Sequence, residues 1–252
     1  MTTTRADTSR AASAAEKRVA ATLTLLRRAA AEHAPAALAS SFGAEDMVLI
    51  DLIAKNALPI GVFTLDTGRL PEETHALIDR VRSVYRIDVG VRFPDATAVE
   101  RFVGANGVNA FYESAALREQ CCAIRKTQSL ARALAGKGAW ITGLRREQSV
   151  TRREVAVEEF DLAHGLAKFN PLADWTRDDV WAYLRAHHVP YNALHDRGYA
   201  SIGCAPCTRA IEPGEDERAG RWWWESADRK ECGLHRRPVS VPVVQASVSN
   251  PA

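Results

Sequence analysis

Apolar residues recur at helical spacing in three stretches of the first third of the chain. Residues 17–35, 47–56 and 71–85 combine this spacing with strong helix formers. The third stretch opens with Pro71 and has acidic residues in its first turn, which is typical of a helix start. Short apolar runs separate the helices and predict strands at 36–41, 59–68, 86–93 and 138–144.

The alternation of strands and helices, with short connections, predicts an α/β fold with a mainly parallel sheet and flanking helices. In such sheets ligands gather at the carboxyl ends of the strands. Three polar turns follow predicted strands: SFGAED at 41–46, LDTGRLPEE at 65–73 and TGLRREQS at 142–149. We therefore expect loops from three separate parts of the chain to surround one pocket.

The composition of the sequence changes after about residue 195, where Gly, Pro and charged residues dominate and the hydrophobic periodicity is lost. We predict a flexible N-terminal tail at 1–16, an α/β domain at 17–209 and a C-terminal arm at 210–252 that wraps the domain. The N-terminus is polar and lacks the long apolar core of a signal peptide or membrane span. We therefore expect a cytoplasmic protein.

The 252 residues, 46% apolar and 25% charged, are ordinary for a soluble globular protein that buries a core without disulfides. The net charge of +2 does not predict non-specific nucleic-acid binding. In a reducing cytosol the five cysteines serve metals or redox chemistry more often than disulfides.

Four of the cysteines form two close pairs, the adjacent Cys121 and Cys122 and the CxxC of Cys204 and Cys207. Four thiolates suit a tetrahedral zinc or an iron–sulfur cubane. Adjacent residues of a helix diverge by about 100°, which favours ligands to two irons of a [4Fe-4S] cluster. Structural zinc and buried structural thiols remain the alternatives.

A helix is predicted to begin at Cys121 and to continue past Lys126. Its N-terminal dipole would favour the negative charge of the thiolates. Lys126 lies one turn beyond Cys122, where it could offset cluster charge and reach an anionic substrate. An ordinary solvated lysine is the alternative interpretation.

The loop after the first predicted strand has the features of an anion cradle. Ser40 and Ser41 offer hydroxyls, Gly43 permits close approach of a ligand, and the following helix start offers free amides. The loop has neither the Lys of a Walker loop nor the GxGxxG of a dinucleotide site. Asp66 in LDTG is interpreted either as a site residue or as the cap of the next helix. Arg145 and Arg146 suit phosphate or sulfate oxygens, although exposed Arg pairs are common.

The fifth cysteine, Cys232, stands apart in a polar stretch, with Arg229 and Lys230 before it and His235 after it. Basic neighbours favour the thiolate, and an accessible position suits a nucleophile or redox thiol. An incidental surface thiol is the alternative.

Together these segments resemble the assimilatory sulfonucleotide reductases, specifically the iron–sulfur adenylyl-sulfate (APS) reductases. The matching segments run in the family's order from about residue 38 to 235; they are SFGAEDMVL, FTLDTGRLPEET, CCAIRK, WITGLRREQS, KFNPLADWTRDDVWAYL, GYASIGCAPCTRAI, PGEDERAGRWWWE and KECGLH. Members that use phosphoadenylyl sulfate (PAPS) usually lack both cysteine pairs.

The resemblance implies the adenine-nucleotide α-hydrolase fold, related to the ATP pyrophosphatases, and a site at its strand ends. The implied nucleotide-binding residues are Ser40, Ser41, Phe42, Gly43, Asp66, Thr67 and Gly68. The residues implied to contact the phosphate–sulfate group are Lys126, Arg218, Arg221 and His235. Arg145 and Arg146 would add positive potential at the rim of the pocket.

The resemblance also implies that Cys232 attacks the sulfur of APS, releasing AMP and leaving an S-sulfocysteine. Thioredoxin or a glutaredoxin-type dithiol would then release sulfite. The implied cofactor is a [4Fe-4S] cluster held by the four paired cysteines, and we also expect a homo-oligomer.

Three other interpretations stay open: a reductase of PAPS or of both nucleotides, an ATP-pyrophosphatase-type enzyme such as a tRNA thiolase, and a non-enzymatic iron–sulfur or zinc protein. The triple tryptophan at 222–224 suits core or arm packing, a subunit interface or a platform for the reductant.

Overall fold

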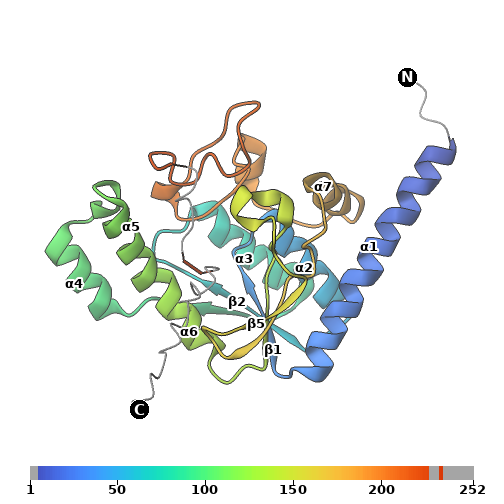
Figure 1. Cartoon of the computed structure of the whole chain (residues 1–252), viewed down its shortest axis with the longest axis horizontal. Helices are drawn as coiled ribbons and strands as arrows, with labels where there is room; N and C mark the ends of the chain where they lie inside the picture. The colour runs from blue at the N-terminus through green and yellow to red at the C-terminus, as the bar shows by residue number, and fades with distance from the viewer. Residues whose placement is uncertain (1–4, 227–232, 235–252) are drawn as a thin grey trace, which may run out of the picture.

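The computed structural model describes residues 5–226 and 233–234. A six-stranded sheet in the order β3-β2-β1-β4-β6-β5 forms its centre (Figure 1). Neighbouring strands are parallel except for β5, which runs antiparallel to β6 at one edge. The strands are β1 (Ala36–Ser40), β2 (Ile60–Leu65), β3 (Val89–Arg92), β4 (Ala139–Ile141), β5 (Glu158–Asp161) and β6 (Leu166–Phe169). The predicted mainly parallel α/β fold is confirmed.

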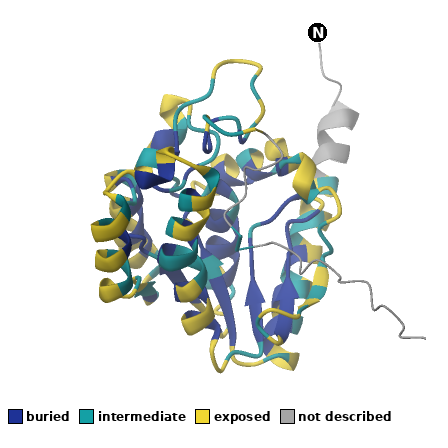
Figure 2. Ribbon diagram, turned by 60° about the vertical axis from the view of Figure 1, so that its left-hand side comes forward, coloured by how far each residue is buried: buried dark blue, intermediate teal, exposed yellow. Residues whose placement is uncertain are grey.

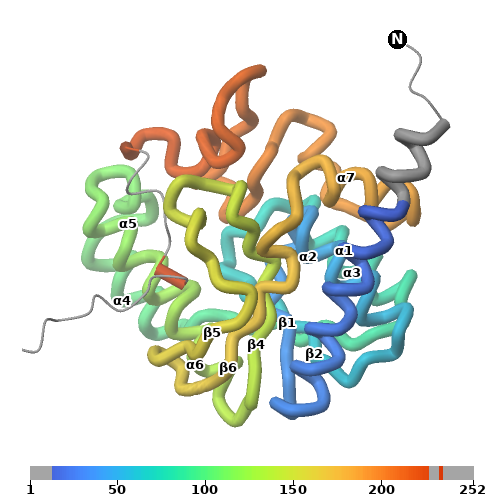
Figure 3. The backbone as a smooth tube through the Cα atoms, turned by 45° about the vertical axis from the view of Figure 1, so that its right-hand side comes forward, coloured from blue at the N-terminus to red at the C-terminus, as the bar shows by residue number. Residues whose placement is uncertain are grey.

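Helices cover both faces of the sheet, as the tube in Figure 3 shows. They are α1 (Arg5–Glu32), α2 (Ala44–Lys55), α3 (Glu72–Tyr85), α4 (Ala96–Asn106), α5 (Ala115–Cys122), α6 (Gln128–Leu134) and α7 (Arg177–Ala186). None of the helices in the described part of the chain has the length and apolar character needed to cross a bilayer.

Successive residues of β1 serve two separate cores, because side chains of a strand alternate between its faces. Leu38 packs with Leu49 of α2 and Leu184 of α7 in the larger core, to which α1 and α3 also contribute. Ala37 faces the other way and packs with Leu130 of α6. The four inner strands β2, β1, β4 and β6 are accordingly buried along most of their length (Figure 2), whereas the edge strands β3 and β5 are not.

Residues 198–226 return across the carboxyl ends of the strands. The amide of Ala205 donates to the carbonyl of Arg69, beyond β2, at 2.8 Å. Within this segment Arg209 donates its amide to Gly220, and Thr208 forms an isolated bridge with Arg221. The predicted boundary between residues 209 and 210 therefore lies inside one structural unit.

Two expectations about helices were wrong. The predicted tail at 1–16 is helical from Arg5, because this Ala-rich stretch continues the helical pattern of 17–35. The helix predicted to begin at Cys121 instead begins at Ala115, where the Ser114 hydroxyl accepts a hydrogen bond from the amide of Leu117. Cys121 and Cys122 end α5, and a π-helical turn (Ala123–Thr127) leads into α6. A helix N-terminus therefore does not stabilise these two thiolates.

A buried carboxylate joins three helices behind the sheet. Asp51 of α2 is 1% exposed and accepts hydrogen bonds from the hydroxyls of Tyr85 and Tyr183, each at 2.7 Å. Lys55 lies 2.9 Å from the same carboxylate. Burial, followed by the bond to Asp51, raises the pKa of both tyrosines, so they remain hydroxyl donors.

We expect Asp51→Ala to lower the free energy of unfolding by about 3 kcal/mol, because two hydroxyls lose their acceptor inside the protein. Tyr85→Phe is the control, since it removes one donor and should cost about 1 kcal/mol. Urea unfolding measures both. Equal losses in the two variants would contradict a central role for the carboxylate.

Candidate active site

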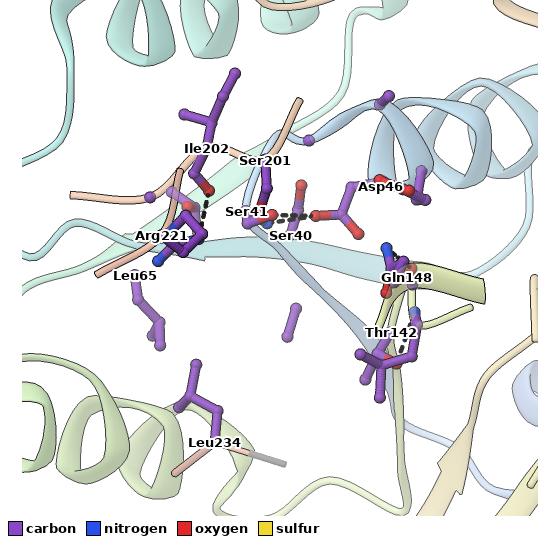
Figure 4. Close-up of a pocket in the computed structure, with 18 of the residues that line it drawn as sticks. Ser40, Ser41, Asp46, Leu65, Thr142, Gln148, Ser201, Ile202, Arg221 and Leu234 are labelled. Atoms are coloured by element: carbon purple, nitrogen blue, oxygen red, sulfur yellow. Dashed lines mark hydrogen bonds between the residues drawn. The ribbon is translucent and has the colours of Figure 1, made fainter. Parts of the chain in front are cut away.

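A cavity of about 190 Å³ opens at the carboxyl ends of β1, β2 and β4. Its polar lining comes from the three predicted loops and from the returning segment (Figure 4). The predicted site residues that line it are Ser40, Ser41, Gly43, Thr67, Lys126, Arg218 and Arg221. The prediction that these separate loops surround one pocket is confirmed.

The serine loop is held by an acid of its own helix. The Asp46 carboxylate accepts hydrogen bonds from the amide of Ser41 at 2.6 Å and from its hydroxyl at 2.8 Å. Ser40 accepts from the amide of Phe42, whose φ is +58°. The Phe42 side chain is fully buried in the larger core and does not line the cavity, contrary to expectation. These donors of Ser41 are therefore directed at a carboxylate in this structure.

Glycine at position 143 makes this arrangement possible. A Cβ atom there would lie 2.4 Å from the Asp46 carboxylate and 2.9 Å from the Cβ of Glu45. The loop after β4 consequently approaches the start of α2 more closely than any larger residue would allow.

The LDTG turn connects the first cavity to a cysteine. Thr67 lines the cavity, and its hydroxyl lies 3.2 Å from the Cys204 sulfur. Asp66 accepts from the amide of Gly68 at 2.8 Å and also contacts His75 at 2.8 Å. Asp66 and Gly68 lie beside the cavity without lining it, so Asp66 shapes the turn. It does not cap the next helix, which its alternative interpretation expected, because the N-cap of α3 is Pro71.

Arg145 and Arg146 do not contribute to the cavity rim. Arg145 is 0% exposed and lies within 3.1 Å of three carboxylates, those of Glu45, Glu147 and Glu217. Arg146 pairs with Asp174 and donates to the carbonyl of Val155. The expected positive rim was wrong here because both guanidinium groups have acidic partners that lie far away in the sequence.

Four cationic side chains line the cavity instead: Lys126, Arg152, Arg218 and Arg221. Arg218 and Arg221 are both buried, at 9% and 6% exposure. Glu45, Asp46 and Glu217 also line the cavity and give it an acidic part. In Figure 4, Arg221 and Asp46 lie on opposite sides of Ser41. The cavity therefore offers one ligand both cationic groups that bind anions and carboxylates that accept hydrogen bonds.

A second, smaller cavity adjoins the first and is lined by Cys121, Cys122, Cys204 and Cys207. These side chains share one apolar cluster with Phe111, Trp222 and Trp224. Lys126 and Trp222 line both cavities.

The thiols differ in their electrostatic surroundings. Burial raises the pKa of Cys207 to about 12, and it also raises the pKa of Cys121. Burial opposes ionisation of Cys204 too, but the Lys126 charge and the Thr67 hydrogen bond outweigh it and lower the pKa. A metal binds thiolate, so among Cys121, Cys204 and Cys207 the surroundings of Cys204 most favour the form that coordinates. Within residues 5–226 and 233–234, no three His, Cys, Asp or Glu side chains group closely enough to hold a single metal ion.

Cys232 and His235 lie outside the described residues, and their predicted roles stay predictions. Leu234, between them, lines the first cavity and packs against the core cluster that contains Leu130 and Trp140.

The model of the phosphoadenosine phosphosulfate reductase domain matches residues 35–210. This chain belongs to that family. It is 60% identical over 211 residues to the adenosine 5'-phosphosulfate reductase of Burkholderia cepacia, covering 84% of each chain. It is 54% identical over 220 residues to the enzyme of that name from Allochromatium vinosum, covering 87% of this chain and 86% of the relative. The resemblance inferred from the motifs is confirmed.

Solved structures agree on the fold. The phosphoadenylyl-sulfate (PAPS) reductase of Candida auris, in a phosphate complex, superposes with a TM-score of 0.65 at 26% identity, covering 75% of this chain and 90% of that one. The FMN adenylyltransferase of Candida glabrata has a TM-score of 0.56 at 13% identity, over 81% and 69% of the two chains. The latter likeness shows the fold alone, and it agrees with the predicted adenine-nucleotide α-hydrolase class.

Sequence reasoning missed several polar residues of the cavity, among them Asp46, Gln148, Arg152 and Glu217. Asp46 and Gln148 lie inside the motifs SFGAED and TGLRREQS, in which the serines and the arginine pair were the predicted site residues. Glu217 lies inside PGEDERAGRWWWE, directly before the predicted Arg218. Arg152 lies outside the motifs and carries no local signal, because only the folded chain brings it to the strand ends.

Asp46 should make stability depend on pH in an unusual direction. Burial, assisted by the charge of Glu45, raises its pKa from 3.8 to about 6, although Ser41 opposes the shift. A raised acid pKa favours the folded state below pH 3.8, and this contribution is lost as the pH rises through 6. Relative to Asp46→Asn, the wild type should lose about 3 kcal/mol of unfolding free energy between pH 3.5 and 7.5. A difference independent of pH would contradict this.

Proposed function

We propose that this chain reduces adenosine 5'-phosphosulfate (APS) to sulfite and AMP, using electrons from a dithiol protein. The observation that carries the proposal is the contact between a cation-lined cavity and a four-cysteine cavity, which share Lys126 and Trp222. The relatives at 60% and 54% identity bear the name of this activity and support the same reaction.

The cationic side chains suit the phosphosulfate group of APS. Arginine presents a planar set of donors that fits phosphate and sulfate oxygens. Buried in the wall of the cavity, Arg218 and Arg221 would neutralise the charge that develops on AMP as it leaves. Lys126 would act on the same group from the side of the cysteines.

Cys232 would supply the nucleophile. Its thiolate attacks the sulfur of APS, the bond from that sulfur to the bridging oxygen breaks, and AMP leaves with the electron pair. The product is an S-sulfocysteine on the enzyme. The basic residues beside Cys232 favour the thiolate form that this step needs. His235 would bind the anionic phosphosulfate group or the proton of the Cys232 thiol.

A thioredoxin- or glutaredoxin-type dithiol would complete the reaction. One of its thiolates attacks the Cys232 sulfur and expels sulfite, forming a mixed disulfide. Its second thiol then displaces Cys232, so the two electrons come from the dithiol, which ends as a disulfide. The enzyme is unchanged at the end of these steps, because Cys232 is released again as a thiolate.

The four paired cysteines fit a [4Fe-4S] cluster. They converge from the end of α5 and from a 3-10 turn (Ala205–Cys207) on one apolar pocket. A cubane takes one thiolate per iron, so its ligands need not meet at a single point. When bound, the cluster would place a fixed charge beside the substrate cavity, and Lys126 would offset it.

The acidic part of the cavity favours APS over PAPS, the alternative substrate. Glu45, Asp46 and Glu217 can accept hydrogen bonds from a ribose hydroxyl or an adenine amine. A further phosphate on the nucleotide would be repelled by these carboxylates. A role in assimilatory sulfate reduction, a cytoplasmic location and a homo-oligomeric state are further predictions from the sequence.

Anaerobically purified protein supplied with thioredoxin should release sulfite from APS at least about tenfold faster than from PAPS, because of this repulsion. Comparable rates would mean that the acidic residues do not select the nucleotide. No sulfite from either nucleotide would refute the proposed reaction.

Lys126→Ala should reduce sulfite release about 100-fold while the visible absorbance and the iron content of the cysteine site stay at wild-type levels. Lys126→Arg, which keeps the charge, should recover part of the activity. Loss of iron in both variants would show instead that Lys126 holds the cysteine site together.

A further inference from the structure

The indole ring of Trp222 separates the two cavities. It is 1% exposed, lines both of them, and belongs to the apolar cluster of the four cysteines. Its neighbour Trp223 is 40% exposed and lines neither cavity. Trp222 therefore borders both cavities, which distinguishes it from a residue that only packs in the core.

Two guanidinium groups lie over the Trp222 ring, one from each cavity. The Arg221 guanidinium, from the substrate cavity, is 4.7 Å from the ring centroid. The Arg118 guanidinium, from the cysteine cavity, is 4.9 Å from it. Cation–π contacts of this kind are strongest with tryptophan and gain strength when water is excluded.

The two arginines are held differently. Arg118, on α5, forms a two-pronged ion pair with Glu225 of the returning segment, at 2.9 and 2.7 Å, and this pair fixes its position. The Arg221 guanidinium donates one hydrogen bond, to the carbonyl of Ile202 at 3.1 Å. Among the described residues Arg221 forms no ion pair with an acidic side chain. Contact with the ring is thus a main determinant of where the Arg221 charge lies.

The local backbone is strained to keep this arrangement. Trp222 has a φ of +41°, which a bulky residue rarely adopts. Its indole N–H and the Arg221 Nε are buried without hydrogen-bond partners in the described part of the chain. Such costs persist where the surroundings enforce them, and they are frequent at functional sites.

We propose that Trp222 is a positioning residue, whose ring fixes the Arg221 guanidinium in the substrate cavity and links it through Arg118 to the cysteine-bearing helix. Given the proposed function, the group that Arg221 then meets is the phosphosulfate of APS. The indole itself need not touch the substrate.

The test compares Trp222→Leu with Trp222→Phe and with Trp223→Leu, a control from the same segment. Trp222→Leu should raise the KM for APS and the Kd of AMP about tenfold, because Arg221 loses its support. Trp222→Phe, which keeps a weaker aromatic face, should fall between this variant and wild type. Trp223→Leu should leave both constants unchanged. If Trp222→Leu fails to fold, Trp222→Phe takes its place in the comparison with Trp223→Leu.

A double-mutant cycle with Arg221→Met separates positioning from general stability. If Trp222 acts through Arg221, replacing Trp222 should add less than about twofold to the Kd of AMP once Arg221 is gone. Additive effects in the cycle, or equal effects of Trp222→Leu and Trp223→Leu, would overturn the inference.

Calorimetry with AMP and with inorganic sulfate distinguishes failure of this inference from failure of the proposed reaction. Wild-type protein that binds AMP but releases no sulfite from APS would refute the reaction, and the cycle would still test Trp222. Wild-type protein that binds neither AMP, APS nor sulfate would overturn both.

Discussion

A guanidinium group without solvent exposure, that of Arg145, joins the parts of the chain that build the site. It follows β4 and pairs with Glu45 at the start of α2 and with Glu217 in the returning segment. Removing one partner of such a buried ionic cluster typically costs about 3–5 kcal/mol, because the remaining charges lose their compensation. The shape of the cavity depends on this cluster, since both glutamates line it.

The Arg145 cluster also holds the returning segment, which places the cation-lined cavity next to the paired cysteines. Residues 198–226 bring Cys204 and Cys207 to the end of α5, where the other cysteine pair lies. They also bring Arg218 and Arg221 to the strand ends. The strand ends by themselves carry the serine loop and its acidic residues Glu45 and Asp46. The returning segment adds two of the four cations that line the cavity, Arg218 and Arg221, and two of the four paired thiols.

The sequence predicted what local patterns determine. Alternating apolar runs predicted the parallel sheet, and the polar turns after β1, β2 and β4 predicted the place of the cavity. The antiparallel strand β5 was not foreseen, because it has only four residues and most of them are polar. The start of α5 was misplaced, since the cap Ser114 was overlooked and the π-helical turn lengthens the helix around the cysteines.

Side-chain partners from distant parts of the chain were beyond sequence reasoning. Arg145 looked like an exposed phosphate ligand and instead is enclosed by carboxylates, of which Glu217 lies 72 residues away. Phe42 looked like part of the nucleotide loop and packs in the core, because a positive φ turns its side chain inward. The motifs located the cavity, but only the fold decided which of their side chains face it.

Under the proposed reaction, Cys232 accepts the sulfonate of APS while the cavity stabilises departing AMP. Intact-protein mass spectrometry after incubation with APS, with no reductant present, measures this step. We expect one sulfonate per chain, mapped to Cys232 by peptide analysis, with one AMP released, and no adduct in Cys232→Ser. An adduct on another residue, or AMP released without any adduct, would contradict it.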